Sequence, residues 1–340
     1  MSGSLPLNRS KRSRILNRSI FFSLLLFQFI TLPVALAADT SQQAASIINN
    51  MTLASKQLNY DGIFIYKRGP RMDTMRIIHK SGENGESERL ISLTGIPREV
   101  IRNEDSITCI FPDNHAVMVN KSRPQNLLTT ELLPEPIEKI AGFYTFSVAG
   151  KDRIAGRDTH VVNIVPRDKY RYGYQLWIDT DTYLLLKSEL KDSYGKTMEQ
   201  ILFTQIDVMA EIPDHLLEPA INGKGYTWYN RTSEKTPRQD NYLDWKVTWM
   251  PEGFRMSDQE KQLDVTGKMP VVQMVYTDGL AVVSVFVEQL QKNPDVMRGA
   301  SRMGAVNVYA LLNNGHQVTA VGEVPQKTVQ LMATSVKRQN

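Results

Sequence analysis

The chain has 340 residues, with 40 lysines and arginines against 36 aspartates and glutamates, a formal charge of +4 and a single cysteine. One cysteine excludes an intramolecular disulfide, and 41% hydrophobic residues can form cores without one. The positive excess lies in the first 18 residues, because the chain after residue 37 has 35 basic and 36 acidic residues, a charge of −1. That balance argues against a nucleic-acid partner.

Residues 1–37 have the pattern of a signal peptide. Five basic residues precede an uncharged run from Ser19 to Ala38, and Ala35-Leu36-Ala37 supplies the small residues that a signal peptidase accepts. The alternative is an uncleaved membrane anchor, because the run is close to the roughly 20 residues that span a bilayer. Pro33 and the small-residue exit favour cleavage. We therefore predict a soluble, exported protein, and the lack of disulfides suits the bacterial periplasm.

The first predicted domain, residues 38–212, is one helix followed by antiparallel strands. A helix is predicted over residues 40–60, capped by Thr40 or Ser41 and ended by Asp61-Gly62. Alternating strands follow in residues 62–119 and again in residues 159–208, with polar turns between them. Residues 121–150 contain three prolines and predict short helical turns or a loop over the sheet.

A linker is predicted over residues 213–240 and a second domain over residues 241–340. The linker has prolines, glycines and mixed charges without periodicity. In the second domain, Asp278-Gly279 and Asn313-Asn314-Gly315 predict hairpin turns. Pro325 predicts the start of a final helix with a buried stripe of Val329, Met332, Ala333 and Val336.

Cys109 and His115 raise the question of a thiol and its base. Cys109 alternates with Ile107 and Phe111 along a predicted strand, and such a cysteine is typically inert. His115 lies beyond a turn, at no spacing that requires contact with the sulfur. The five histidines are scattered, no nucleotide-binding or nucleophile-elbow motif is present, and Asp179 and Asp181 fit a solvated turn. The sequence thus favours a protein that is not an enzyme and that has neither a cofactor nor a metal.

Binding residues are predicted in two basic clusters and at two tryptophans. The clusters suit an acidic peptide or the phosphates of a lipid headgroup, although they also fit solvated hairpin tips. The tryptophans could anchor a partner or pack between the domains. A curved sheet with a helix on its concave side could enclose an apolar pocket or a filled core. The candidate residues are Lys67, Arg68, Arg71, Arg76, Arg167, Lys169, Arg171, Trp245 and Trp249.

The order of several segments resembles the MucB/RseB family of periplasmic regulators of an envelope-stress sigma factor. The resemblance covers essentially the whole chain after the signal peptide. The segments, in chain order, are "LNYDG", "GIPREVIRNED", "YGYQLWIDTDTYLLLKSELKDSYGKTMEQILFTQIDV", "WMPEGF", "VYTDGLAVVSVFV" and "VTAVGEVP". None is specific by itself, but their order behind a signal peptide and across a linker is.

The resemblance implies an α+β fold, with an N-terminal LolA-like unclosed antiparallel β-barrel around helices and a smaller α+β domain after it. It implies a protein that binds the periplasmic region of a membrane-spanning anti-sigma factor and shields it from a protease. Lipopolysaccharide or a similar amphiphile would release it, and self-association to a homo-oligomer is expected. The family supplies no catalytic motif to transfer. A periplasmic lipid or lipoprotein carrier is the alternative function, since carriers have the first domain but need no second one.

Overall fold

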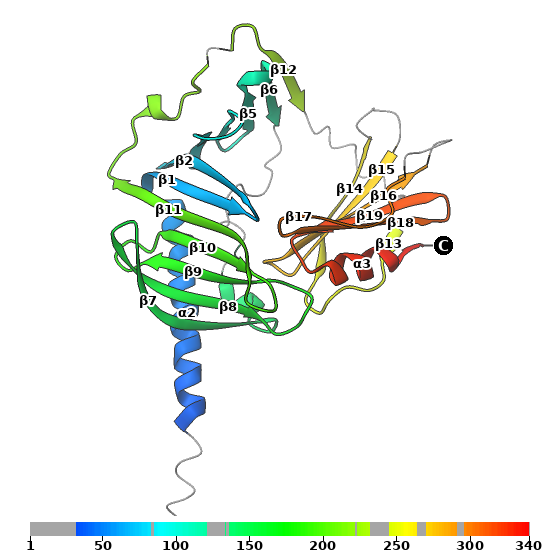
Figure 1. The fold of residues 1–340 in the computed structure, drawn as a ribbon, viewed down its shortest axis with the longest axis horizontal. Helices are drawn as coiled ribbons and strands as arrows, with labels where there is room; N and C mark the ends of the chain where they lie inside the picture. Colours follow the sequence, from blue (N-terminus) through cyan, green and yellow to red (C-terminus); the bar gives the residue numbers. More distant parts are fainter. Residues whose placement is uncertain are drawn as a thin grey trace, which may run out of the picture.

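The computed structural model describes residues 32–82, 85–120, 133, 136–221, 223–231, 245–263, 270–290 and 296–339. Residues 1–31, most of the predicted signal peptide, lie outside this part. The described chain forms a helix on a twelve-stranded sheet, followed by a smaller unit with a six-stranded sheet and a short helix (Figure 1). We call the first unit the N-terminal domain and the second the C-terminal domain.

Neighbouring strands of the large sheet are antiparallel except at one edge, where β12 runs parallel to β6. The sheet is curved, but among the described residues its edge strands β12 and β7 do not pair with each other, so it is not closed. In sheet order the strands are β12 (Thr227–Arg231), β6 (Ala116–Asn120), β5 (Ile107–Phe111), β4 (Glu99–Arg102), β3 (Gly85–Ser92), β2 (Arg71–Gly82), β1 (Asn59–Arg68), β11 (Thr197–Met209), β10 (Leu185–Lys191), β9 (Gly173–Asp179), β8 (Arg157–Pro166) and β7 (Tyr144–Ile154).

The helix α2 (Leu32–Gln57) packs on β7 and β8 and on the short helix η3 (Ile137–Ile140). Ala44, Ile48 and Met51 on α2 are fully buried, because their spacing places them on one face. They fill the concave side of this half of the sheet together with Ile140 and Ile164. Here the predicted core is therefore packed with side chains.

The helix starts earlier than predicted. Thr40 and Ser41 lie inside α2 and do not cap it. The sequence from Leu32 onward explains the extension, since a proline is tolerated in the first helical turn and the alanines and leucine after it favour helix.

The prediction for residues 121–150 was partly wrong. Residues 121–132 and 134–135 lie outside the described part, and η3 is a helical turn as expected. However, the stretch ends in β7, an eleven-residue edge strand. Tyr144, Phe146 and Val148 alternate with polar residues, which is the pattern of a strand, but the prolines before them dominated the interpretation.

The segment predicted as a linker also contributes structure. It holds the short helix η4 (Asp214–Leu216) and β12, which extends the edge of the large sheet beyond β6. Trp228 and Tyr229 on this strand are more than half exposed.

The C-terminal domain confirms the predicted hairpins and the final helix, but the helix ends at Thr334. Val336 of the predicted stripe is buried from strand β20 (Val336–Arg338) and not from the helix. Helix α3 (Gln326–Thr334) begins directly after Pro325 and buries Val329, Met332 and Ala333 against the sheet. Asn314 and Gly315 both have positive φ, as a tight hairpin turn requires. In sheet order the strands are β14 (Arg255–Leu263), β15 (Pro270–Thr277), β16 (Val282–Gln289), β19 (His316–Gly322), β18 (Val306–Asn313) and β17 (Gly299–Met303), and β13 (Trp245–Val247) pairs with β20 (Val336–Arg338). The expected α+β fold, with an unclosed antiparallel sheet and a smaller second domain, is confirmed.

Candidate functional site

The first basic cluster lies at the hairpin between β1 and β2. Lys67 and Arg71 are exposed there, and Arg68 is partly covered by the C-terminal domain, as its close approach to Gly304 shows. Arg76 is farther along β2 and forms a two-pronged ion pair with Asp61. That pair borders a hollow of about 130 Å³, which has room for a few water molecules and not for a lipid.

The second basic cluster divides between solvent and the contact of the two domains. Arg167 and Lys169 are exposed in the loop between β8 and β9. Arg171, in the same loop, is fully buried. Its guanidinium therefore acts within the protein and is no hairpin tip, which corrects the interpretation of this residue as solvated.

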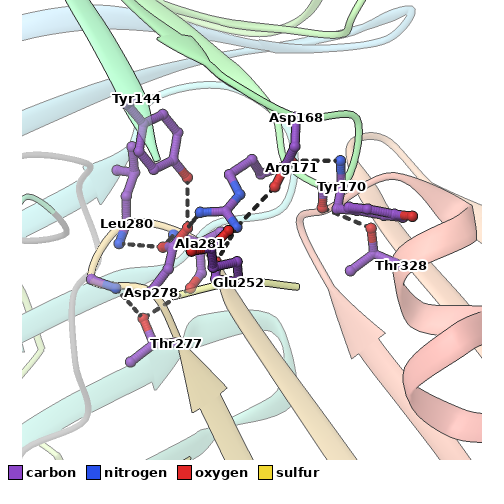
Figure 2. Close-up of polar contacts among 11 residues, drawn as sticks. Tyr144, Asp168, Tyr170, Arg171, Glu252, Thr277, Asp278, Leu280, Ala281 and Thr328 are labelled. Atoms are coloured by element: carbon purple, nitrogen blue, oxygen red, sulfur yellow. Dashed lines mark hydrogen bonds and ion pairs between the residues drawn. The ribbon is translucent and has the colours of Figure 1, made fainter. Parts of the chain in front are cut away.

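Arg171 and Asp278 form an ion pair across the domain contact. Nη1 of Arg171 lies 2.7 Å from Oδ2 of Asp278, and neither side chain is exposed to solvent (Figure 2). The other terminal nitrogen of Arg171 donates to the carbonyl oxygen of Glu252, at 2.5 Å, and lies 3.0 Å from the Asp168 carboxylate. A buried ion pair with several hydrogen bonds is costly to break from one side only, because the remaining charge has no solvent.

Tyr144 of the N-terminal domain also binds Asp278. Its hydroxyl donates to Oδ2 of Asp278, at 2.9 Å. Burial raises the pKa of Tyr144, and the Asp278 charge raises it further, so the phenol remains a donor. The rings of Phe143, Tyr144 and Phe254 surround the Arg171 guanidinium at 5.2 to 5.5 Å from their centroids. Rings from both domains thus favour the buried cation.

The turn between β15 and β16 inserts into the N-terminal domain. Oδ1 of Asp278 accepts the N–H groups of Leu280 and Ala281, at 2.8 and 2.7 Å, so one carboxylate shapes the turn and binds Arg171 (Figure 2). The positive φ of Gly279 suits this tight turn. Leu280 then packs in the core that α2 shares with β7, β8 and β9. The turn is therefore an anchor of the C-terminal domain in the other domain's core.

Trp249 lies at the domain contact, but Trp245 does not. The ring of Trp249 meets Tyr170 edge-on at 5.2 Å, and Thr328 of α3 donates to the Tyr170 carbonyl oxygen. Trp245 is buried in the core of the C-terminal domain, where its ring meets His316. Of the two predicted tryptophans, only Trp249 packs between the domains.

A second contact between the domains surrounds Glu199 on β11. Its carboxylate accepts the hydroxyl of Tyr66, at 2.6 Å, and the N–H of Ala305 from the other domain, at 3.0 Å. Beside it, Asn307 donates to the hydroxyl of Tyr172 and to the carbonyl oxygen of Val324. Polar groups of the two domains are therefore hydrogen-bonded to each other here, and they are mostly buried.

Cys109 and His115 confirm the strand-and-turn interpretation of their segment. Cys109 lies on β5 opposite Met118 and packs on the core, and burial raises the pKa of its thiol. His115 lies in the turn to β6, and its ring packs on Tyr226. A thiol whose pKa is raised by burial is a poor nucleophile.

Asp179 is also structural, and it is buried and not solvated as the sequence suggested. Its carboxylate accepts the N–H groups of Asp181 and Thr182 and pairs with Arg157. Burial by itself would raise the pKa of Asp179, but these hydrogen bonds outweigh burial and lower it. Among the described residues, no three His, Cys, Asp or Glu side chains gather as a metal ion requires.

The sequence alone did not single out Asp278 as a contact residue, nor Tyr144 or Glu199. Asp278 was recognised only as part of a hairpin turn. Arg171, to which Asp278 binds across the domain contact, is 107 residues away in the chain. Only the tertiary structure brings such pairs together.

Models of two protein domains match the sequence in the order in which the structure has them. The MucB/RseB N-terminal domain matches residues 43–221, and the MucB/RseB C-terminal domain matches residues 239–337. The chain belongs to the MucB/RseB family. Membership in MucB/RseB thus rests on both domains.

Relatives within the MucB/RseB family are similar over nearly their whole length. The Sigma factor AlgU regulatory protein MucB of Pseudomonas aeruginosa is 30% identical over 94% of this chain and 98% of its own. The Sigma-E factor regulatory protein RseB of Escherichia coli is 27% identical over 88% of this chain and 92% of its own.

Solved structures of MucB share the fold. The structure of MucB in complex with MucA(peri) has a TM-score of 0.68, with 28% identity, and covers 87% of this chain and 99% of its own. MucB by itself has a TM-score of 0.60 over 88% of this chain and 99% of its own, also with 28% identity. Within the described part of this MucB/RseB chain, no helix combines the length and apolar character needed to cross a membrane.

Proposed function

We propose that this protein binds the periplasmic region of a membrane-spanning anti-sigma factor and shields it from proteolysis, which keeps an envelope-stress sigma factor inactive. Similarity to MucB in complex with MucA(peri), over both domains, is the observation that supports the proposal most strongly. The function requires an exported protein, so we also propose removal of the signal peptide at residues 1–37 and a periplasmic location.

The contact between the domains suggests that the two domains bind a partner together. The buried Arg171–Asp278 pair and the insertion of Leu280 fix one domain against the other. A partner that contacts both domains then meets a preorganised surface, which lowers the entropy lost on binding.

Release by lipopolysaccharide or a similar amphiphile is the second part of the proposal. A ligand that prefers the partner-free protein lowers its affinity for the partner, and the partner lowers the affinity for the ligand by the same factor. Lys67, Arg71, Arg167 and Lys169 are exposed cations that suit phosphate groups. Arg171 is buried in its ion pair with Asp278, so we do not propose that it binds phosphate. We further propose that the protein forms a homo-oligomer, as the family resemblance implies.

A protease-protection assay tests the proposal. The periplasmic segment of the anti-sigma factor from the same organism is digested with and without residues 38–340 of this protein. We expect slower cleavage at equimolar protein, and renewed cleavage when lipopolysaccharide is added. Unchanged cleavage with folded protein would contradict the binding function. A carrier, the alternative, would instead retain lipid and leave cleavage unaffected.

A further inference from the structure

Strand β17 is an open edge of the six-stranded sheet, on the side of the C-terminal domain that faces the N-terminal domain (Figure 1). Among the described residues, no strand pairs with its outer side. Residues 300–303 of this strand are all exposed, and Met303 is 59% exposed. Such an edge offers unpaired N–H and C=O groups to another polypeptide strand.

The other two antiparallel edges, β7 and β14, are protected against such pairing in a way that β17 is not. The pairing of β7 with β8 shifts register between Val148 and Gly150. The pairing of β14 with β15 shifts between Met256 and Asp258. Irregularities of this kind, with charged residues along the strand, discourage the addition of a further strand. The pairing of β17 with β18 is regular, and residues 299–301 are small and uncharged.

Exposed cations gather where the hairpin of β17 and β18 meets two hairpins of the N-terminal domain. A Cβ on Gly304 would lie 2.5 Å from Cδ of Arg68, at the hairpin of β1 and β2. Ala305 packs with Leu190 and Met198, at the base of the hairpin of β10 and β11. The exposed cations on or directly beside these three hairpins are Lys67, Arg71, Lys196, Arg298 and Arg302.

The carboxylates close to these cations are less exposed than the cations themselves. Asp192 accepts two N–H groups of its own turn. Glu199 is 9% exposed and accepts the N–H of Ala305, and Glu323 is half-buried. An approaching ligand therefore meets a positive surface that spans both domains, and such a surface attracts acidic groups.

We propose that the β17 edge binds an extended, acidic segment of a polypeptide, which joins the six-stranded sheet as a further strand and places its carboxylates against the cations of both domains. Lipid phosphates would also suit the cations, but only a polypeptide strand has donors and acceptors at the spacing of the edge. The strand would come from the periplasmic segment of the anti-sigma factor, so this assignment rests on the proposed function. Competition by phosphate groups for Lys67 and Arg71 would then explain release by an amphiphile.

Hydrogen exchange on residues 38–340, with and without the periplasmic segment of the organism's own anti-sigma factor, tests the assignment. The turn at 304–305 has two residues, so Met303 beside it belongs to a hydrogen-bonded pair, and such pairs alternate along the ladder. The amides of Ala300 and Arg302 therefore point to the open edge. Saturating peptide should slow exchange at both by at least about tenfold. The amide of Gly156, in the exposed turn between β7 and β8, is the control and should not change.

Two variants with matched controls test the edge and the charges separately by titration calorimetry. Ala300→Pro removes an edge N–H and should weaken peptide binding at least about tenfold, whereas Ala300→Ser keeps the N–H and should not. Arg71→Glu with Arg302→Glu reverses one charge in each domain and should weaken binding at low salt, with a smaller effect at high salt. Lys151→Glu on β7 with Lys246→Glu on β13 makes the same change of charge at exposed positions away from the three hairpins and should have little effect.

The outcomes separate this assignment from the proposed function. Saturable binding without slower exchange at Ala300 and Arg302 would overturn the assignment alone, and no binding by folded protein would contradict both. If Ala300→Pro does not fold, the charge-reversed variant decides, and binding equal to that of its control overturns the assignment. A charge-reversed variant that binds the peptide normally but loses binding to vesicles of anionic phospholipid would assign the cations to a lipid surface instead.

Discussion

Asp278 has two roles, one for each oxygen atom of its carboxylate. Oδ1 accepts two N–H groups of its own turn, and Oδ2 binds Arg171 and Tyr144 of the other domain. The turn role was predictable from Asp278-Gly279, because this dipeptide is a strong local signal. The second role was not, because it depends on a guanidinium brought close by the fold. Burial of both charges then makes this single residue important for the domain contact.

Replacing Asp278 with alanine should lower the free energy of unfolding by about 3–5 kcal/mol, because Arg171 would remain charged and buried without its partner. Urea denaturation measures the change. In a double-mutant cycle, Asp278→Ala with Arg171→Ala should cost clearly less than the sum of the two single changes. Asp214→Ala, which breaks an exposed ion pair with Lys80, is the control and should have little effect. Additive costs at Asp278 and Arg171 would show that the pair contributes no coupling.

Replacing Cys109 with alanine should be tolerated, with a loss on the order of 1 kcal/mol from packing. Partner binding should remain unchanged, since the thiol has a raised pKa and lies in a strand. Thermal unfolding and a binding assay on the same preparation check both points. A stably folded variant that no longer bound the partner would mean that the cysteine has a chemical role.

The elements show which kind of sequence signal is reliable. Strong alternation located the paired strands β1, β2, β9 and β11, and helical spacing located α2 and α3. Strand β7 was missed because the prolines before it led us to predict turns or a loop over the whole of residues 121–150. Strand β12 was missed because an edge strand of five residues depends on its partner β6 more than on its own pattern. The contact between the domains was missed for the same reason: each half makes sense only beside the other.

Leu280 tests the turn between β15 and β16 as an anchor. Leu280→Ala should lower the free energy of unfolding by about 2–5 kcal/mol, because the side chain is buried in the core of the N-terminal domain. Leu312→Ala on β18 of the C-terminal domain, to which Leu280 also belongs, is the matched control, since Leu312 is 36% exposed and should matter much less. Chemical denaturation of the two variants in parallel gives the comparison. Equal costs would contradict the anchor.

At the scale of the whole molecule, the domains are joined by buried polar groups, by aromatic contacts such as Tyr170 with Trp249, and by the inserted side chain of Leu280. Interfaces of this kind within a chain allow movement when individual contacts are lost. The sequence predicted two domains and a linker between them. It could not predict their relative placement, because that depends on pairs such as Arg171 with Asp278 and Glu199 with Ala305, which are more than 100 residues apart.

Coupling between the domains should appear in scanning calorimetry. Residues 38–340 are expected to unfold in one transition at neutral pH, since the contact links the two cores. Asp278→Ala with Leu280→Ala should separate this into two transitions, because the ion pair and the inserted side chain are both removed. Two well-separated transitions in the unaltered protein would contradict coupling.

Titration calorimetry of residues 38–340 with the periplasmic segment of the organism's own anti-sigma factor tests the central claim most directly. The account predicts saturable binding, and a weaker affinity for a variant with the domain contact broken by Asp278→Ala and Leu280→Ala. Circular dichroism on the same samples establishes that each protein is folded. No binding by the folded, unaltered protein would contradict the proposed function.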